Sequence, residues 1–290
     1  MQTPKGPKAS HCPSFRARAR ARRRGFEQRY PSMRQLQKLS ILFILFLFPL
    51  FGEEKYPINP YVDPSVWKAV TPYFLPIDDP IKPVLDKIFK KARVTTNKES
   101  LEKAGFRHVR DTSYSLITVA VHPKLSGYLF KFYTDNVDRK DWSAWIKRIE
   151  GAKSIKRAIK QLKYEKHFTV PQKWIYPLPA DPSPLDNGIQ RKNFILIVED
   201  MEILPGKGNR AQWRGPFMTY ERLDAIFTIV EREGLSDSTC SNLPFNHKGK
   251  QSFIDTERHH HWPVPYGKIM PYLSTDKQEY LLQLIHGGEN

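Results

Sequence analysis

Apolar and polar residues alternate along the chain in patterns that predict both strands and helices. The β-branched run at 115–121 and the aromatic run at 128–133 are separated by a turn, so we expect them to pair as a hairpin. Between 142 and 162, apolar residues recur at three- and four-residue steps, which predicts an amphipathic helix with a strongly basic opposite face. Gly151 is the point at which this helix could divide.

The second half of the chain continues the same alternation. In order, the pattern predicts a loop and strand at 168–176, a strand at 193–200, a helix at 220–233, a hairpin of 243–245 with 251–254, and a closing helix at 278–285. Gly234 supplies the stop signal of the 220–233 helix.

The N-terminal part of the chain contains a short apolar run next to basic residues. Residues 40–51 are almost entirely apolar and follow two basic residues. A membrane-spanning helix needs roughly twenty apolar residues and a signal-peptide core about 7–15, so this length favours an export signal at 33–52. An uncleaved signal anchor is the alternative. We expect Met33 to be the natural start, with 1–32 as a basic extension; a nucleic-acid-binding arm or a transit peptide would be the competing interpretation.

Length and composition allow a sizeable core, in one large domain or two small ones. The chain has 290 residues, of which 40% are hydrophobic and 27% charged, with a formal net charge of +17. Eleven basic side chains and one acid lie in residues 1–52, which leaves an ordinary basic remainder and no dedicated nucleic-acid module. The basic face at 147–163 is a candidate surface for an anionic partner. Cys240 is the sole cysteine after the predicted signal, so no internal disulfide can form there.

Three polar residues near the C-terminal end suggest chemistry. Asp237 is followed by Asn242 after four intervening residues, and Asp255 closes the apolar run of the predicted hairpin. Carboxylate and amide oxygens are hard ligands that suit Mg²⁺ carrying a phosphorylated substrate. Glu257 lies two places further and could assist. His259–His261 are expected to form a surface or interface cluster, with metal binding as the alternative.

The order of these elements and residues resembles the protein-kinase-like fold. The resemblance implies an α+β architecture with two lobes, an antiparallel-sheet N-lobe at 94–203 and a reduced helical C-lobe at 204–290, after a Pro-rich wrapping segment at 53–93. It also implies Mg²⁺ or Mn²⁺ and ATP as cofactors, and a hydroxyl group of an unknown acceptor as the substrate.

The same resemblance assigns roles to individual residues. Lys131 would grip the nucleotide phosphates and Asp237 would orient or deprotonate the accepting hydroxyl. Glu150 would pair with the lysine, and the strand end at Glu199 and Met201 would meet the adenine ring. The remaining three residues, Asn242, Asp255 and Glu257, would hold the metal.

Several departures from the family pattern leave a second hypothesis open. No glycine-rich loop lies between Gly105 and Ser115, no histidine-arginine pair precedes Asp237, and Thr256 follows Asp255 where the family usually has phenylalanine. Only 33 residues follow Glu257, too few for a large helical lobe. The sequence therefore predicts either an exported kinase-like phosphotransferase or a catalytically inactive, pseudokinase-like binding module. Contact with a membrane is expected only through 33–52.

Overall fold

The computed structural model describes residues 56–109, 116–135, 137, 141–183 and 190–287. Internal contacts divide the chain into two compact units, Met1–Glu53 and Glu54–Asn290. All described residues belong to the second unit, so the predicted extension at 1–32 and the predicted signal at 33–52 lie outside them. Among the described residues, no helix combines the length and the apolar character needed to cross a membrane.

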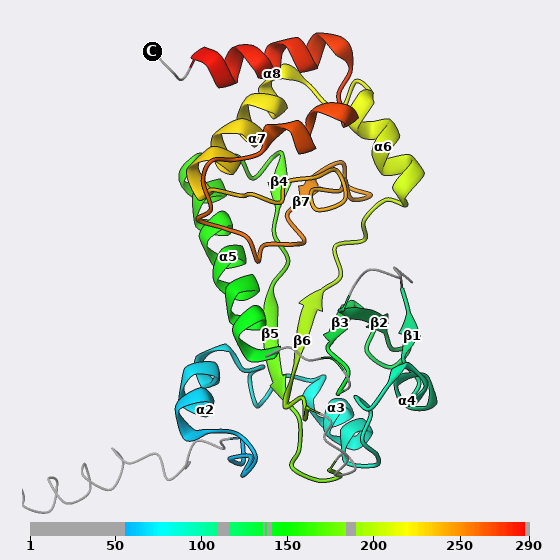
Figure 1. Ribbon diagram of the computed structural model, residues 1–290. Coiled ribbons are helices and arrows are strands. Elements are labelled where there is room, and N and C mark those ends of the chain that lie inside the picture. Colours follow the sequence, from blue (N-terminus) through cyan, green and yellow to red (C-terminus); the bar gives the residue numbers. More distant parts are fainter. Residues whose placement is uncertain (1–55, 110–115, 136, 138–140, 184–189, 288–290) are drawn as a thin grey trace, which may run out of the picture. The chain divides into compact units, whose positions relative to one another are not determined.

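The second unit is an α+β structure with a five-stranded antiparallel sheet and a separate two-stranded sheet (Figure 1). Its strands are β1 (Arg107–His108), β2 (Thr118–Val121), β3 (Tyr128–Phe132), β4 (Phe168–Thr169), β5 (Lys173–Pro177), β6 (Phe194–Glu199) and β7 (Gln251–Ser252). Its helices are α2 (Pro64–Val70), α3 (Lys82–Phe89), α4 (Lys98–Lys103), α5 (Asp141–Gln161), α6 (Gly206–Arg214), α7 (Tyr220–Glu233) and α8 (Thr275–Gly287), with short 3-10 helices η1 (Thr71–Tyr73), η2 (Tyr266–Lys268) and η3 (Met270–Tyr272).

The large sheet has the strand order β1-β2-β3-β6-β5. The predicted hairpin of the first two apolar runs is confirmed, because β2 and β3 pair antiparallel with Thr118 opposite Phe132. On its other side β3 pairs with β6, where Lys131 lies opposite Leu196. Lys131 therefore lies on the central strand of the five-stranded sheet.

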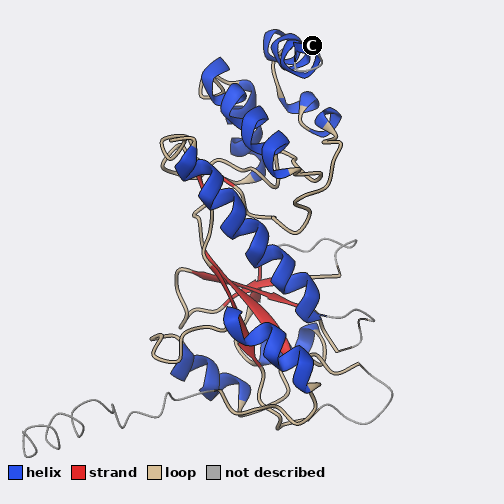
Figure 2. Ribbon diagram, turned by 90° about the vertical axis from the view of Figure 1, so that its left-hand side faces the viewer, coloured by secondary structure: helices blue, strands red, loops and turns tan. Residues whose placement is uncertain are grey.

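Helix α5 is continuous over the range in which the sequence predicts an amphipathic helix, and Gly151 does not divide it. The helix packs against β5 and β6 and also contacts α7, and Figure 2 shows it crossing in front of the sheet. A Cβ at Gly151 would lie 2.0 Å from the carbonyl oxygen of Thr256. Glycine is therefore needed here because another segment of backbone approaches the helix closely.

Buried apolar side chains form three clusters among the described residues. One joins the sheet to α3 and α4, and a second joins the opposite face of the sheet to α2 and α5. The third gathers side chains of α5, α6, α7 and α8 around the two-stranded sheet. Alternating burial along β2 and β3 and continuous burial along β6 place these strands between the first two clusters.

The region after α7 differs in part from prediction. The helix ends as expected, since Gly234 adopts a left-handed conformation with φ of 57°. The predicted hairpin is confirmed, because Phe245 and Gln251 form an antiparallel bridge and the N–H groups of Ser252 and Ile254 donate to the carbonyls of Pro244 and Asn242 at 2.8 and 3.1 Å. The parallel pairing of β7 with β4 was not predicted. It uses the alternate residues Gln251 and Phe253, whose N–H groups donate to the carbonyls of His167 and Thr169 at 2.9 and 3.0 Å.

The Pro-rich segment packs against the edge of the sheet. The Leu75 N–H donates to the Ile175 carbonyl at 2.9 Å, which adds one bridge to the β5 edge. Phe74 lies with its ring centroid 5.1 Å from that of Trp67 and 6.3 Å from that of Phe194. Aromatic side chains therefore dock this segment onto the sheet.

Candidate functional site

Lys131 is the cation at the centre of the candidate site. The pKa of its ammonium is lowered from 10.5 to about 8, first by burial and then by the guanidinium of Arg148. Asp255 and Glu257 act in the opposite direction, because nearby carboxylates favour the charged form. Burial, together with three residues from other parts of the sequence, therefore sets the charge of the strand lysine.

The segment that carries Asp255 and Glu257 is anchored on α5 and β5 through Thr256. The Thr256 hydroxyl donates to the Arg148 carbonyl at 2.5 Å and accepts from Lys173 Nζ at 2.7 Å. Lys173 also donates to the Ile254 carbonyl at 3.2 Å. Burial, followed by the charge of Lys131, lowers the pKa of Lys173 well below its ordinary value. A buried lysine and a buried threonine thus fix the backbone between the two acids.

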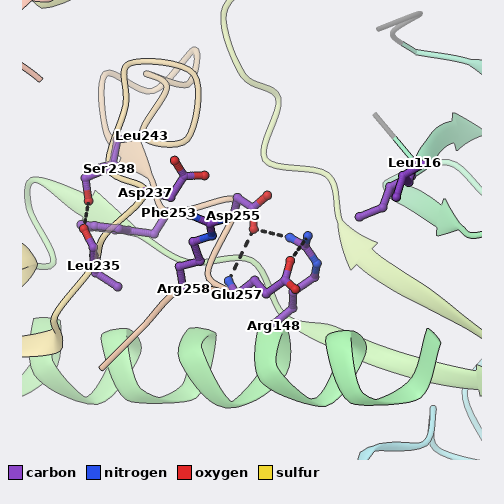
Figure 3. Close-up of a pocket in the computed structure, with 11 residues that line it drawn as sticks. Leu116, Arg148, Leu235, Asp237, Ser238, Leu243, Phe253, Asp255, Glu257 and Arg258 are labelled. Atoms are coloured by element: carbon purple, nitrogen blue, oxygen red, sulfur yellow. Dashed lines mark hydrogen bonds and ion pairs between the residues drawn. The ribbon is translucent and has the colours of Figure 1, made fainter. Parts of the chain in front are cut away.

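Arg148 joins the two acids directly. Its Nη1 donates to Asp255 Oδ1 and its Nη2 donates to Glu257 Oε2. Figure 3 shows the side chain rising from α5 toward both carboxylates. The Arg148 side chain is 5% exposed, and those of Asp255 and Glu257 are 31% and 20% exposed. Burial alone would raise the pKa of Asp255, but the neighbouring cations, Arg148 first, hold it below its ordinary value.

Asp237 lies between an amide and a lysine. Asn242 Nδ2 donates to the Asp237 carbonyl at 2.7 Å and to its Oδ2 at 3.1 Å. Lys268 Nζ donates to Asp237 Oδ1 at 3.0 Å and to the Ser236 carbonyl at 2.9 Å. The carboxylate of Asp237 is 42% exposed. It is therefore oriented from two sides while it stays accessible to another molecule.

Two neighbouring cavities collect most of the residues predicted from the sequence. The first has a volume of about 260 Å³ and combines apolar side chains of β2, β3 and β6 with five of the predicted residues. These five are Lys131, Glu199, Met201, Asn242 and Asp255. Glu199 also accepts the Gln172 N–H at 3.0 Å, which fixes the strand end.

The second cavity, of about 420 Å³, is more polar. It is lined by Asp237, Asp255 and Glu257 together with Arg148 and Arg258, and Figure 3 shows this arrangement. Ile117 and Asp255 line both cavities, so the two spaces adjoin at these residues. An extended ligand could therefore place an apolar ring in the first cavity and an anionic group near the second.

Glu150 is the predicted site residue that the structure places elsewhere. Its carboxylate lies 3.4 Å from Lys153 Nζ, and it forms a hydrogen bond with the Tyr73 hydroxyl. It lines neither of the two cavities. The correction has a geometric reason, because Glu150 lies two residues beyond Arg148 on α5 and so faces a different direction from the residue that reaches the cluster.

Sequence reasoning missed the structural importance of Arg148 and Lys173. Its charge suggested that Arg148 belongs to the exposed basic face of the helix. In the structure Arg148 is buried, whereas the other basic residues of that face are exposed. Its spacing could have indicated burial, because Arg148 lies three residues after Trp145 and four before Ala152, on the apolar side of the helix. Lys173 carries no such signal, because its partners come from the 254–256 segment.

The predicted metal ligands fit Mg²⁺ poorly in this arrangement. Asp255 Oδ1 and Glu257 Oε2 already accept from Arg148, and the Asn242 amide donates to Asp237. Among the described residues, no group of three or more His, Cys, Asp or Glu side chains is placed to hold a metal ion. A divalent cation would have to displace the guanidinium to reach these carboxylates.

The other residues singled out in the sequence add no chemistry to the site. Cys240 is buried, and burial raises the pKa of its thiol to about 11, so the reactive thiolate is disfavoured. His260 is exposed and stacks on Trp262 with ring planes 6° apart. His259 is half-buried, and burial lowers the pKa of its imidazole.

Comparisons with known proteins give little further guidance. No protein-family model matches the chain, and no curated protein matches it. Among solved structures, the chain is similar to the Rv3197–erythromycin complex from Mycobacterium tuberculosis, with 16% sequence identity over 80% of this chain and 68% of that chain. The TM-score is 0.30, so this likeness supports no conclusion about fold or function.

Proposed function

We propose that the second unit is a two-lobed, kinase-like domain that binds a nucleotide. The observation that carries the proposal is that five residues chosen from the sequence for nucleotide or metal contact line one cavity. The apolar lining of this cavity suits a base, and Lys131 lies beside it as a cation for phosphate. The strand order, with Lys131 on the central strand before helix α5, agrees with what the resemblance implies.

The geometry favours binding over metal-assisted phosphoryl transfer. Arg148 already donates hydrogen bonds to both carboxylates that would hold Mg²⁺. The arrangement therefore supports no metal-assisted reaction step. A binding domain that recognises a nucleotide needs only the cavity and its cations. Of the two functions predicted from the sequence, this is the pseudokinase-like binding module.

Phosphotransfer to a hydroxyl acceptor is the second candidate, and Asp237 is the observation that favours it. Its carboxylate is accessible, lines the larger cavity, and is oriented by Asn242 and Lys268. A general base must be positioned and reachable in this way. Asp237→Asn should abolish any nucleotide-dependent transfer while it leaves nucleotide affinity within about threefold of wild type, a difference below 1 kcal/mol.

The proposal is tested by thermal denaturation of the full-length protein with ATP, ADP, GTP and adenosine. A ligand at about 100 times its Kd stabilises a folded protein by about 2.7 kcal/mol, so a rise of several degrees in Tm is expected for at least one nucleotide. Lys131→Met should reduce that rise, because it removes the cation and keeps a similar shape. Lys147→Met is the matched control, since Lys147 is exposed on α5. The absence of any nucleotide-dependent rise in wild type, with and without Mg²⁺ or Mn²⁺, would contradict the proposal.

A further inference from the structure

Arg148 is a cation built into the middle of the candidate site. Its side chain is almost entirely buried, comes from the longest helix of the described chain, and bridges two carboxylates through separate guanidinium nitrogens. Such charge-assisted hydrogen bonds are among the strongest in proteins, and the planar guanidinium presents its donors in a fixed geometry. The position between two acids is one that a divalent cation would otherwise suit.

The surrounding charges favour an anionic ligand without an added cation. The carboxylates are those of Asp237, Asp255 and Glu257. Arg148 and Arg258 line the same cavity, Lys268 bonds to Asp237, and Lys131 and Lys173 lie close enough to Asp255 to affect its pKa. Each of the three carboxylates already accepts a hydrogen bond from a cationic side chain of the protein, Arg148 or Lys268. A metal-dependent phosphate site instead keeps its acids available for the divalent ion.

We propose that Arg148 takes the place of a divalent cation in this site, so that nucleotide phosphates bind without Mg²⁺ or Mn²⁺. The inference rests on the proposed nucleotide binding and deepens it by defining the ligand as metal-free nucleotide polyphosphate. Arg148 neutralises Asp255 and Glu257, which would otherwise repel the phosphates. Lys131 is then available for the phosphates themselves.

Isothermal titration of the full-length protein with ATP and ADP tests the inference directly. The Kd in EDTA should equal the Kd in Mg²⁺ or Mn²⁺ within about threefold. Binding that occurs only with metal would overturn this inference and leave the proposed nucleotide binding intact. Binding in neither condition would overturn both. The wild-type comparison decides the matter without any variant.

Arg148→Gln supplies a second measurement. In EDTA the variant should bind ATP at least about tenfold more weakly than wild type, because a charge-assisted contribution is lost and two carboxylates are left uncompensated. Mn²⁺ should recover part of that affinity and should raise the Tm of the variant in the absence of nucleotide, since the carboxylates are free to hold it. Wild type should show no such response to Mn²⁺ alone.

Arg157→Gln is the matched control, because it removes the same charge from an exposed position of the same helix. It should leave both measurements unchanged. Equal ATP affinity of Arg148→Gln and wild type in EDTA would show that the guanidinium does not replace a metal. Circular dichroism establishes that each variant is folded before it is titrated.

Discussion

The ammonium of Lys131 changes its charge within the range of ordinary buffers. Its pKa is lowered to about 8 by burial and by Arg148. Phosphate affinity depends on the charged form, so it should be highest below pH 8 and should fall as the pH rises through that value. Titration calorimetry with ATP at pH 7.0 and pH 9.5 measures the change. Loss of one charge-assisted contact corresponds to a reduction of about tenfold.

The lowered pKa of Lys131 also affects folding stability, which should rise with pH where phosphate affinity falls. Between about pH 8 and the ordinary value of 10.5, the unfolded chain binds the proton that the folded protein has released. Stability therefore rises with pH across this window. Urea denaturation at several pH values should show that rise in wild type and a smaller one in Lys131→Met. Identical pH profiles of the two proteins would contradict the assignment.

At the scale of single elements, α5 connects the sheet to the segment that carries the acids. Gly151 allows the Thr256 backbone to approach the helix, and Arg148 holds Asp255 and Glu257 from one turn earlier. The close approach explains why a residue that weakens helices lies at the middle of the longest one. The helix is thus a support for the site as well as a cover for the sheet.

Gly151→Ala should destabilise the protein despite the higher helix propensity of alanine. The added methyl group would meet backbone and the imidazole of His259, and overpacking of this kind costs about 1–3 kcal/mol. Urea denaturation measures the loss. Nucleotide affinity should also fall, because the 255–257 segment has to move.

Gly208→Ala in α6 is the control for this substitution. A Cβ at Gly208 would have Leu204 Cβ as its nearest neighbour, at 4.0 Å, so only the helix propensity changes. The control should be neutral or more stable by up to about 1 kcal/mol. Equal behaviour of the two variants would mean that the close approach at Gly151 has no energetic effect.

For the unit as a whole, the segment before the sheet is part of the hydrophobic core. Leu75 is 1% exposed, and it packs in the cluster that joins the sheet to α3 and α4. Leu75→Ala should lower the free energy of unfolding by about 2–5 kcal/mol. Ile58→Ala, at a position that is 72% exposed, should change it by less than about 0.5 kcal/mol. A small effect at Leu75 would show that the segment is dispensable for folding.

Much of the element order could be predicted, because it depends on local pattern. The β2–β3 hairpin, the stripe of α5 and the glycine stop of α7 each follow from residues close together in sequence. The pairing of β7 with β4 could not be predicted, since it joins segments about 80 residues apart. The hairpin of the same segment with 243–245 is local, and it was predicted correctly.

The candidate site also combines residues that the sequence could predict with a contact that it could not. Asp237, Asn242 and Asp255 were found because their spacing marks them, and Lys131 because the resemblance places a lysine on that strand. All four line the two adjoining cavities. The partnership of Arg148 with Asp255 spans 107 residues, and no local pattern reports it. Charge alone suggested a solvated face, whereas the position of Arg148 in the apolar stripe is what decides its burial.

The attachment of the acids to α5 has a thermodynamic consequence. A ligand of the cavities that displaced Asp255 and Glu257 would act on Arg148, to which both are bonded, and through it on α5. The exposed basic side chains belong to the same helix. An anionic macromolecule bound to that outer face and a small ligand bound in the cavities would then alter each other's affinity by the same factor, because linkage between two binding equilibria is reciprocal.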